Sequence, residues 1–215
     1  MDSGNSFFDL AMGKFDEENA RDPNVEAVHG QARPRELLYA ERLSERVLRL
    51  EPDASETLRL AARCQHICRW KIPRQTQPMT RAGYLRWRQD LKEFHAQTAA
   101  KILRQAGYGE EIIQKVRDLN LKRNFPRDAE SRVLEDALCL VFLEFQFAAL
   151  AGRMGEDKMI NAVQKTWQKM TPAAQAHALA LPLGPKEKAL VQRALQAAAP
   201  RVPAAPKPGE GGSAP

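Results

Sequence analysis

The sequence predicts an all-α protein, because apolar residues recur at three- and four-residue spacing in segment after segment while strict two-residue alternation is hard to find. Its 215 residues are 43% hydrophobic, which is enough for a buried core. The most hydrophobic stretch, residues 138–150, contains Glu144 and Gln146, so no membrane span is expected. The N-terminal residues fit neither a secretory signal nor an Arg-rich transit peptide, and the expected location is therefore cytoplasmic.

The helices are predicted in chain order from these periodic segments. They are expected near residues 5–20, 34–50, 54–71, 81–106, 109–122, 128–153 and 156–170, followed by two short helices near 172–180 and 185–198. Asp53, with Glu56 three residues later, has the arrangement of a capping box. Gly107 suits a left-handed C-terminal cap, and Asp128 is suited to cap the helix after Pro126.

The segments between these helices are expected to be irregular where proline, glycine and polar residues gather. Residues 22–33 are one such segment, and residues 72–79 are another, because Pro73 and Pro78 rule out a continuous helix there. Residues 1–199 are expected to form one helical domain. Residues 200–215 are rich in Pro, Ala and Gly, which predicts a disordered tail.

Positive charge is concentrated in one part of the chain. The net charge is +6, and residues 63–104 alone hold ten Lys and Arg against two acidic residues. This surplus favours an anionic ligand, although a solvated basic face is the commoner explanation of a charge run. The expected anion-binding residues flank or follow the loop at Pro73: Arg69, Arg74, Arg81, Arg86 and Arg88. Trp70, Tyr84 and Trp87 lie among them and are candidates either for stacking on a base or for the core.

Polar residues on predicted buried faces form the second group of candidates. His66, His95 and Asp136 each lie on an apolar helical stripe, where a polar side chain must be paired, metal-bound or neutral. Imidazole and carboxylate together are ligands for a divalent ion such as Mn, Fe, Zn or Mg. The alternative is that each side chain finds a separate partner, and for Glu144 a buried Arg or His partner is preferred. Three cysteines, Cys64, Cys68 and Cys139, are expected to be core residues.

Four segments in order resemble the helical core of the HD-domain metal-dependent phosphohydrolases. They are LLYAERLSERVL, LAARCQHICRW, FHAQTAAKILRQAGYGEEIIQKV and DAESRVLEDALCLVFLE, and the likeness covers about Pro34 to Phe145. The resemblance implies an HD-like helical bundle in which Asp136 matches the late metal-binding aspartate and His95 an accessory histidine. Tyr39 stands where the first histidine would be, and Gln65 and His66 replace the His-Asp doublet. Glu135, next to Asp136, joins Tyr39, Gln65 and the three aromatic residues as an expected part of the pocket.

Nearly the whole chain also resembles a family catalogued only as domain of unknown function 4202. The phrases that carry this resemblance are ARCQHICRWKIPR, PMTRAGYLRWR, FHAQTA, LEDALCLVFLE and KTWQKM. The QHICRW form is then typical of the family, which has no assigned reaction. The resemblance implies the fold and the place of the site without supplying a function.

Three functional hypotheses follow from these observations. The first is a metal-dependent hydrolase of a nucleotide or other phosphoester, with His66, His95 and Asp136 as ligands of the ion. The second is a non-catalytic module on the same scaffold that binds a nucleotide or an RNA segment. The third is a helical adaptor whose basic strip docks an acidic protein. A phosphorylated small molecule is the preferred partner. The sequence does not indicate which oligomeric state the protein has.

Overall fold

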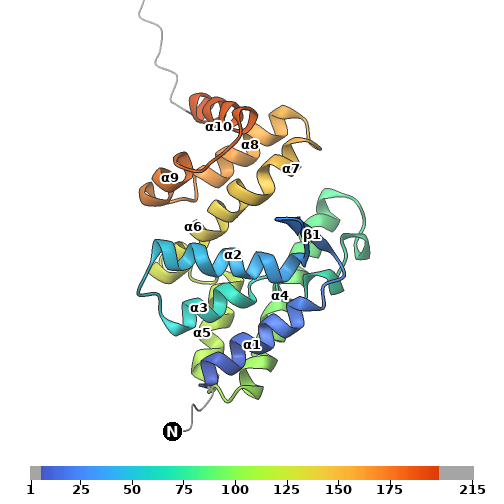
Figure 1. Ribbon diagram of the computed structural model, residues 1–215, viewed down its shortest axis with the longest axis vertical. Coiled ribbons are helices and arrows are strands. Elements are labelled where there is room, and N and C mark those ends of the chain that lie inside the picture. The colour runs from blue at the N-terminus through green and yellow to red at the C-terminus, as the bar shows by residue number, and fades with distance from the viewer. Residues whose placement is uncertain (1–5, 199–215) are drawn as a thin grey trace, which may run out of the picture.

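Helices occupy nearly every segment for which they are predicted, so the all-α class is confirmed. The computed structural model describes residues 6–198, and the predicted disordered tail at 200–215 lies outside them. In Figure 1, α8, α9 and α10 gather at one end of the long axis, α1 and α5 lie toward the other end, and α6 and α7 run between. The helices are α1 (Phe7–Ala20), α2 (Arg35–Leu50), α3 (Glu56–Cys64), α4 (Arg81–Gln105), α5 (Glu110–Leu121), α6 (Ala129–Val141), α7 (Phe147–Ala151), α8 (Glu156–Trp167), α9 (Pro172–Leu179) and α10 (Pro185–Ala198).

A two-stranded antiparallel hairpin lies where residues 22–33 were expected to be irregular. Strand β1 (Val25–Val28) pairs with β2 (Gln31–Pro34), and Val28 faces Gln31 across the turn. His29 and Gly30 form this turn with φ values of 50° and 78°, the positive values that two-residue hairpin turns require. Both strands have only exposed and half-buried residues, so the sequence has no alternation of apolar and polar residues from which they could be predicted.

Helix α3 is shorter than predicted and begins with a different cap. Ser55, and not Asp53, caps it by accepting a hydrogen bond from the amide of Leu58 at 3.1 Å. The helix ends at Cys64, whereas the apolar pattern suggested continuation to residue 71, because the backbone turns at residues 65–67 and Cys68 has a left-handed conformation with φ 55°. The pattern continues past the helix end because Ile67 and Cys68 are both fully buried.

The long predicted helix 128–153 is a helical rod interrupted by one wider turn. Asp128 caps α6 as predicted, by accepting from the amide of Ser131 at 2.7 Å. Residues 142–146 then form a π-helical turn before α7 continues the rod. Gly107, with φ 98°, ends α4 as predicted and lets the chain turn into α5.

The core consists of three hydrophobic clusters that lie along this rod. The largest gathers α1 to α6 around residues such as Phe15, Leu43, Leu58, Leu103 and Leu134. The second joins α6 to α9, and the third joins α7, α8 and α10 around Phe147. Phe142 packs against both the second and the third cluster. Among the helices described, none is long and apolar enough to cross a membrane.

Candidate functional site

A cavity of about 530 Å³ lies where the end of α3, the middle of α4, the end of α5 and one face of α6 meet. This volume is within the range of small-molecule sites, about 300–1,000 Å³. Its walls include Leu91, Leu138 and Phe142, and its aromatic residues are Tyr84 and Trp87. The polar lining is formed by Gln65, His66, Arg69, Arg88, Lys92, His95, Asn120, Lys122, Glu135, Gln146, Thr166 and Lys169.

Positive charge dominates this lining. Five cationic side chains face one carboxylate, that of Glu135, which is buried. Lys122 contacts one oxygen of Glu135, and the ammonium of Lys169 lies 3.3 Å from the other. Burial alone would raise the pKa of Glu135, but the two lysines outweigh it and hold the pKa below its usual value. Glu135 is therefore ionised and neutralises only part of the charge around the cavity.

Three cations of the lining have no carboxylate partner. Within residues 6–198, neither Arg69, Arg88 nor Lys92 lies within 4.0 Å of an acidic oxygen. Burial lowers the pKa of Lys92, and the neighbouring charges of Lys122 and Arg88 lower it further. Uncompensated cations that repel one another in a concave site are stabilised by a bound anion.

The aromatic residues hold the guanidinium groups beside the cavity. The guanidinium carbon of Arg69 lies 5.0 Å from the ring centroid of Trp87, and that of Arg88 lies 5.8 Å from the ring centroid of Tyr84. Trp87 is itself fixed, because its indole nitrogen donates a 2.9 Å hydrogen bond to the carbonyl oxygen of Ile72. A ring and its paired cation thus form one surface of the site.

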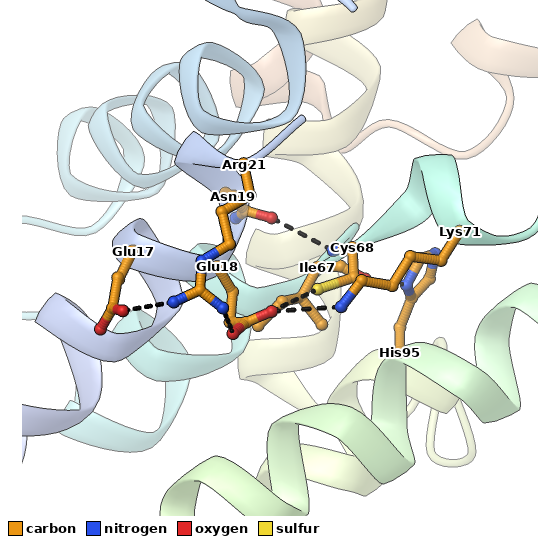
Figure 2. Close-up of polar contacts among 8 residues, drawn as sticks. All are labelled: Glu17, Glu18, Asn19, Arg21, Ile67, Cys68, Lys71 and His95. Carbon is orange, nitrogen blue, oxygen red and sulfur yellow. Dashed lines mark hydrogen bonds and ion pairs between the residues drawn. The ribbon is translucent and has the colours of Figure 1, made fainter. Parts of the chain in front are cut away.

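His95 is held in one orientation by the backbone after α3. Its Nδ1 lies 2.7 Å from the carbonyl oxygen of Ile67, and since a carbonyl can only accept, Nδ1 carries the proton. Asn19 of α1 fixes the next residue by accepting from the amide of Cys68 at 3.2 Å, as Figure 2 shows. Burial lowers the pKa of His95 to about 4, so the ring is neutral near pH 7 and its Nε2 has a free lone pair.

His66 lies between His95 and Tyr39. Its ring stacks on that of Tyr39 with centroids 4.2 Å apart and planes 13° apart, and its centroid is 5.7 Å from that of His95. Burial lowers the pKa of His66 well below its usual value, and the charge of Arg69 contributes in the same direction. Glu36 lies 3.8 Å from His66 Nδ1, and burial raises the pKa of Glu36 to about 7.

The structure does not assemble the predicted metal ligands. Asp136 accepts hydrogen bonds from the amide and the hydroxyl of Thr171, at 2.9 and 2.5 Å, and is absent from the cavity lining. Its neighbour Glu135 faces the cavity instead, because successive residues of a helix are about 100° apart around its axis. In the part of the chain that the structure describes, no three His, Cys, Asp or Glu side chains are grouped to hold a metal ion. Among residues 6–198, the side chains around the cavity therefore do not form a ligand set for a divalent ion.

The predicted anion-binding arginines separate into two groups. Arg69 and Arg88 line the cavity, whereas Arg81 and Arg86, which are exposed like Arg88, do not. Arg74 also lies outside the lining and serves the loop, because its guanidinium donates to the carbonyl oxygens of Gln77, Pro78 and Thr80 at 2.8 to 3.3 Å.

Some of the other predicted pocket residues line the cavity, and others lie outside it. Gln65, Tyr84, Trp87 and Glu135 line the cavity, and Tyr39 supports His66 from behind. Trp70 packs against the largest hydrophobic cluster and is not part of the lining.

Sequence reasoning missed Lys92, Asn120, Lys122 and Lys169. Lys92 belongs to the basic segment that was recognised, and its neighbour Leu91 marks the inner face of α4. Lys122 and Lys169 lie outside that segment, and only the fold brings them to it. Glu144 was predicted correctly, since Arg46 Nε donates to its carboxylate at 3.1 Å.

Comparison with known proteins places the chain in one family. The model of the family described as "Domain of unknown function (DUF4202)" matches residues 9–191. No curated protein and no solved structure matches the chain significantly. The resemblance to the HD-domain phosphohydrolases therefore stays a prediction.

Proposed function

The chain belongs to this family of unknown function, and we propose that its cavity binds a small phosphorylated compound, with a nucleotide as the preferred candidate. One observation carries the proposal: five cationic side chains line a single concave site that contains one carboxylate. Phosphate oxygens satisfy such cations by Coulombic attraction and by charge-assisted hydrogen bonds.

The shape and the aromatic residues favour a small ligand with a planar group. A cavity of about 530 Å³ accommodates a mononucleotide-sized molecule rather than a length of nucleic acid. Tyr84 and Trp87 line the same cavity and offer ring faces to a base. A nucleotide thus uses the cationic and the aromatic parts of the lining together.

Hydrolysis of the bound ester, expected from the sequence, stays a prediction and is not part of the proposal. The histidines near the cavity and Asp136 do not form one ligand set, so no metal-dependent step is derived from them. Release of inorganic phosphate from adenosine 5′-triphosphate, followed with and without added Mn²⁺, is the direct measurement of such an activity.

The binding proposal is tested with two arginines of one helix that differ in position. Both arginines are exposed, but Arg88 lines the cavity, whereas Arg86, two residues earlier, lies outside it. We expect Arg88→Ala to weaken binding of inorganic pyrophosphate and of adenosine 5′-monophosphate about tenfold in calorimetric titrations, because a charge-assisted hydrogen bond contributes about 1.5–3 kcal/mol.

Arg86→Ala is the matched control, with the same change of net charge on the same helix. We expect it to alter both dissociation constants less than about twofold, because Arg86 lies outside the cavity and salt screens its charge from a ligand bound there. Equal losses in the two variants would mean that only the general basic field attracts anions. No measurable binding of pyrophosphate to the wild-type protein would overturn the proposal, and tighter binding of single-stranded RNA than of either compound would indicate a nucleic-acid partner.

A further inference from the structure

We infer that the floor of the cavity recognises a neutral hydrogen-bond donor of the ligand, a hydroxyl or an amino group, at a distance from its phosphate. This inference rests on the proposed function and names the class of ligand. It follows from three side chains that line the same cavity, each of which has a buried polar atom without a hydrogen-bond partner within residues 6–198: Gln65 Oε1, His95 Nε2 and Asn120 Oδ1.

These three side chains are among the most buried of the lining. Gln65 is 7% exposed, His95 3% and Asn120 2%. Leaving a buried acceptor without a donor destabilises the folded protein, because the acceptor has lost its hydrogen bonds to water. Native proteins leave few buried polar groups in this state, and such groups concentrate where a ligand or water completes the site.

Hydrogen bonds on the protein side determine that two of the atoms are acceptors. The proton of His95 is on Nδ1, which faces the carbonyl oxygen of Ile67, so Nε2 has a lone pair. The amide nitrogen of Asn120 donates to the sulfur of Cys64 at 3.1 Å, while that sulfur faces the carbonyl oxygen of Ala61 at 3.7 Å. The nitrogen side of Asn120 is thereby occupied, and its oxygen is the free atom.

The same contacts bring together side chains from α4, from α5 and from the turn after α3. Asn120, near the end of α5, is bonded to Cys64, and His95 of α4 is bonded to Ile67. Gln65 lies between these two residues in the turn that follows α3. The acceptors therefore surround one short turn, which Asn19 and Cys68 hold in place (Figure 2).

A cluster of acceptors selects against the charged end of the ligand. A phosphate oxygen presents lone pairs to lone pairs at this floor, whereas Arg69, Arg88 and Lys92 present donors to it elsewhere in the lining. The ligand is thus oriented with its phosphate at the cations and a hydroxyl or amino group at the acceptors. Sugar phosphates provide the first group, and nucleotides with an amino-bearing base provide either one.

The first test compares ligands on the wild-type protein. Adenosine 5′-monophosphate is titrated beside 2′,3′-dideoxyadenosine 5′-monophosphate, which lacks the ribose hydroxyls, and purine riboside 5′-monophosphate, which lacks the amino group. We expect one of the two deletions to weaken binding about tenfold, because the buried acceptors then lose their donor. The deletion that does so identifies the donor group. Equal dissociation constants for all three compounds would overturn the inference.

The second test removes one acceptor from the protein. Gln65→Met replaces the amide by an apolar side chain of similar length, and Gln97→Met makes the same change at an exposed position of α4. We expect Gln65→Met to raise the dissociation constant of adenosine 5′-monophosphate about tenfold and to leave that of inorganic pyrophosphate unchanged. Gln97→Met should change neither constant.

The pyrophosphate arm separates the two proposals. Failure of wild-type protein to bind pyrophosphate would remove the proposed function and the inference with it. Binding of pyrophosphate that is retained in Gln65→Met, together with unaltered binding of adenosine 5′-monophosphate, would overturn the inference alone and point to an ordered water as the partner of Gln65 Oε1. Asn120→Leu, analysed in the same way, repeats the test from α5 if Gln65→Met does not fold.

Discussion

Glu36 and His66 show how strongly the interior beside the cavity disfavours charge. Burial raises the pKa of the Glu36 carboxyl to about 7, while burial lowers the pKa of His66, which lies 3.8 Å away. Both side chains are therefore predominantly neutral in weakly acidic solution.

The raised pKa of Glu36 predicts a dependence of stability on pH. The folded protein retains the Glu36 proton up to about pH 7, whereas the unfolded chain releases it near about pH 4.5. Stability from this group is therefore lost as pH rises through that window. We expect Glu36→Gln to gain about 1–3 kcal/mol relative to wild type between pH 5 and pH 8, measured by urea denaturation.

A surface glutamate provides the comparison for this measurement. Glu45→Gln, in the same helix and exposed, should show the same free-energy difference from wild type at both pH values. A parallel pH profile for Glu36→Gln and wild type would contradict the raised pKa.

At the scale of elements, α6 performs two tasks with adjacent residues. Glu135 faces the cavity and contacts Lys122 and Lys169, whereas Asp136 anchors Thr171, the N-terminal cap of α9. The sequence predicts that both carboxylates lie on a buried helix. It does not specify the partners of the two carboxylates, because Lys122, Lys169 and Thr171 lie in the segments between other helices.

This division predicts opposite effects for neighbouring substitutions. Asp136→Ala should lower the free energy of unfolding by about 2 kcal/mol, because it removes two hydrogen bonds at the start of α9. The same substitution should leave pyrophosphate binding unchanged.

Glu135→Gln should instead tighten pyrophosphate binding, because Lys122 and Lys169 lose their competing carboxylate. Thermal denaturation and calorimetric titration of both variants provide the check. Loss of pyrophosphate binding in Asp136→Ala would contradict this division and would indicate that Asp136 belongs to the binding site.

The elements that sequence predicts best are those that depend on their own periodicity. Helix α2 and helix α4 begin and end within one residue of expectation, because their apolar spacing and boundaries are local. The hairpin at residues 25–34 was missed because its strands have no buried face, and the end of α3 was missed because Asn19 and His95 hold the following turn from a distance. Gln65 and Arg69, which the sequence predicts as pocket residues, line the cavity, whereas Lys122 and Lys169 were not predicted because only the fold brings them to the basic segment.

At the scale of the whole molecule, the basic field of the cavity predicts a salt dependence that discriminates between parts of the ligand. Increasing ionic strength from about 0.05 to 0.5 M shortens the Debye length to a few ångströms, so attraction between the cations and phosphate weakens. We expect the dissociation constant of pyrophosphate to rise about tenfold, by calorimetric titration. For two ligands of equal charge that differ only in the neutral donor group, the ratio of their affinities should stay constant as salt is added. A ratio that falls with salt would contradict a neutral hydrogen bond at the floor of the cavity.

The π-helical turn at residues 142–146 determines how α7 is rotated about the helix axis relative to α6. Phe142 and Gln146 at its two ends line the cavity, and Phe147, the next residue, is fully buried in the third cluster. The i→i+5 hydrogen bonding of this turn accommodates one residue more than an α-helical turn, whereas an uninterrupted α-helix through the same residues would turn α7 by about 100° relative to α6. Deleting one residue here would therefore close an ordinary α-helical turn and keep the cavity and the C-terminal helices in register.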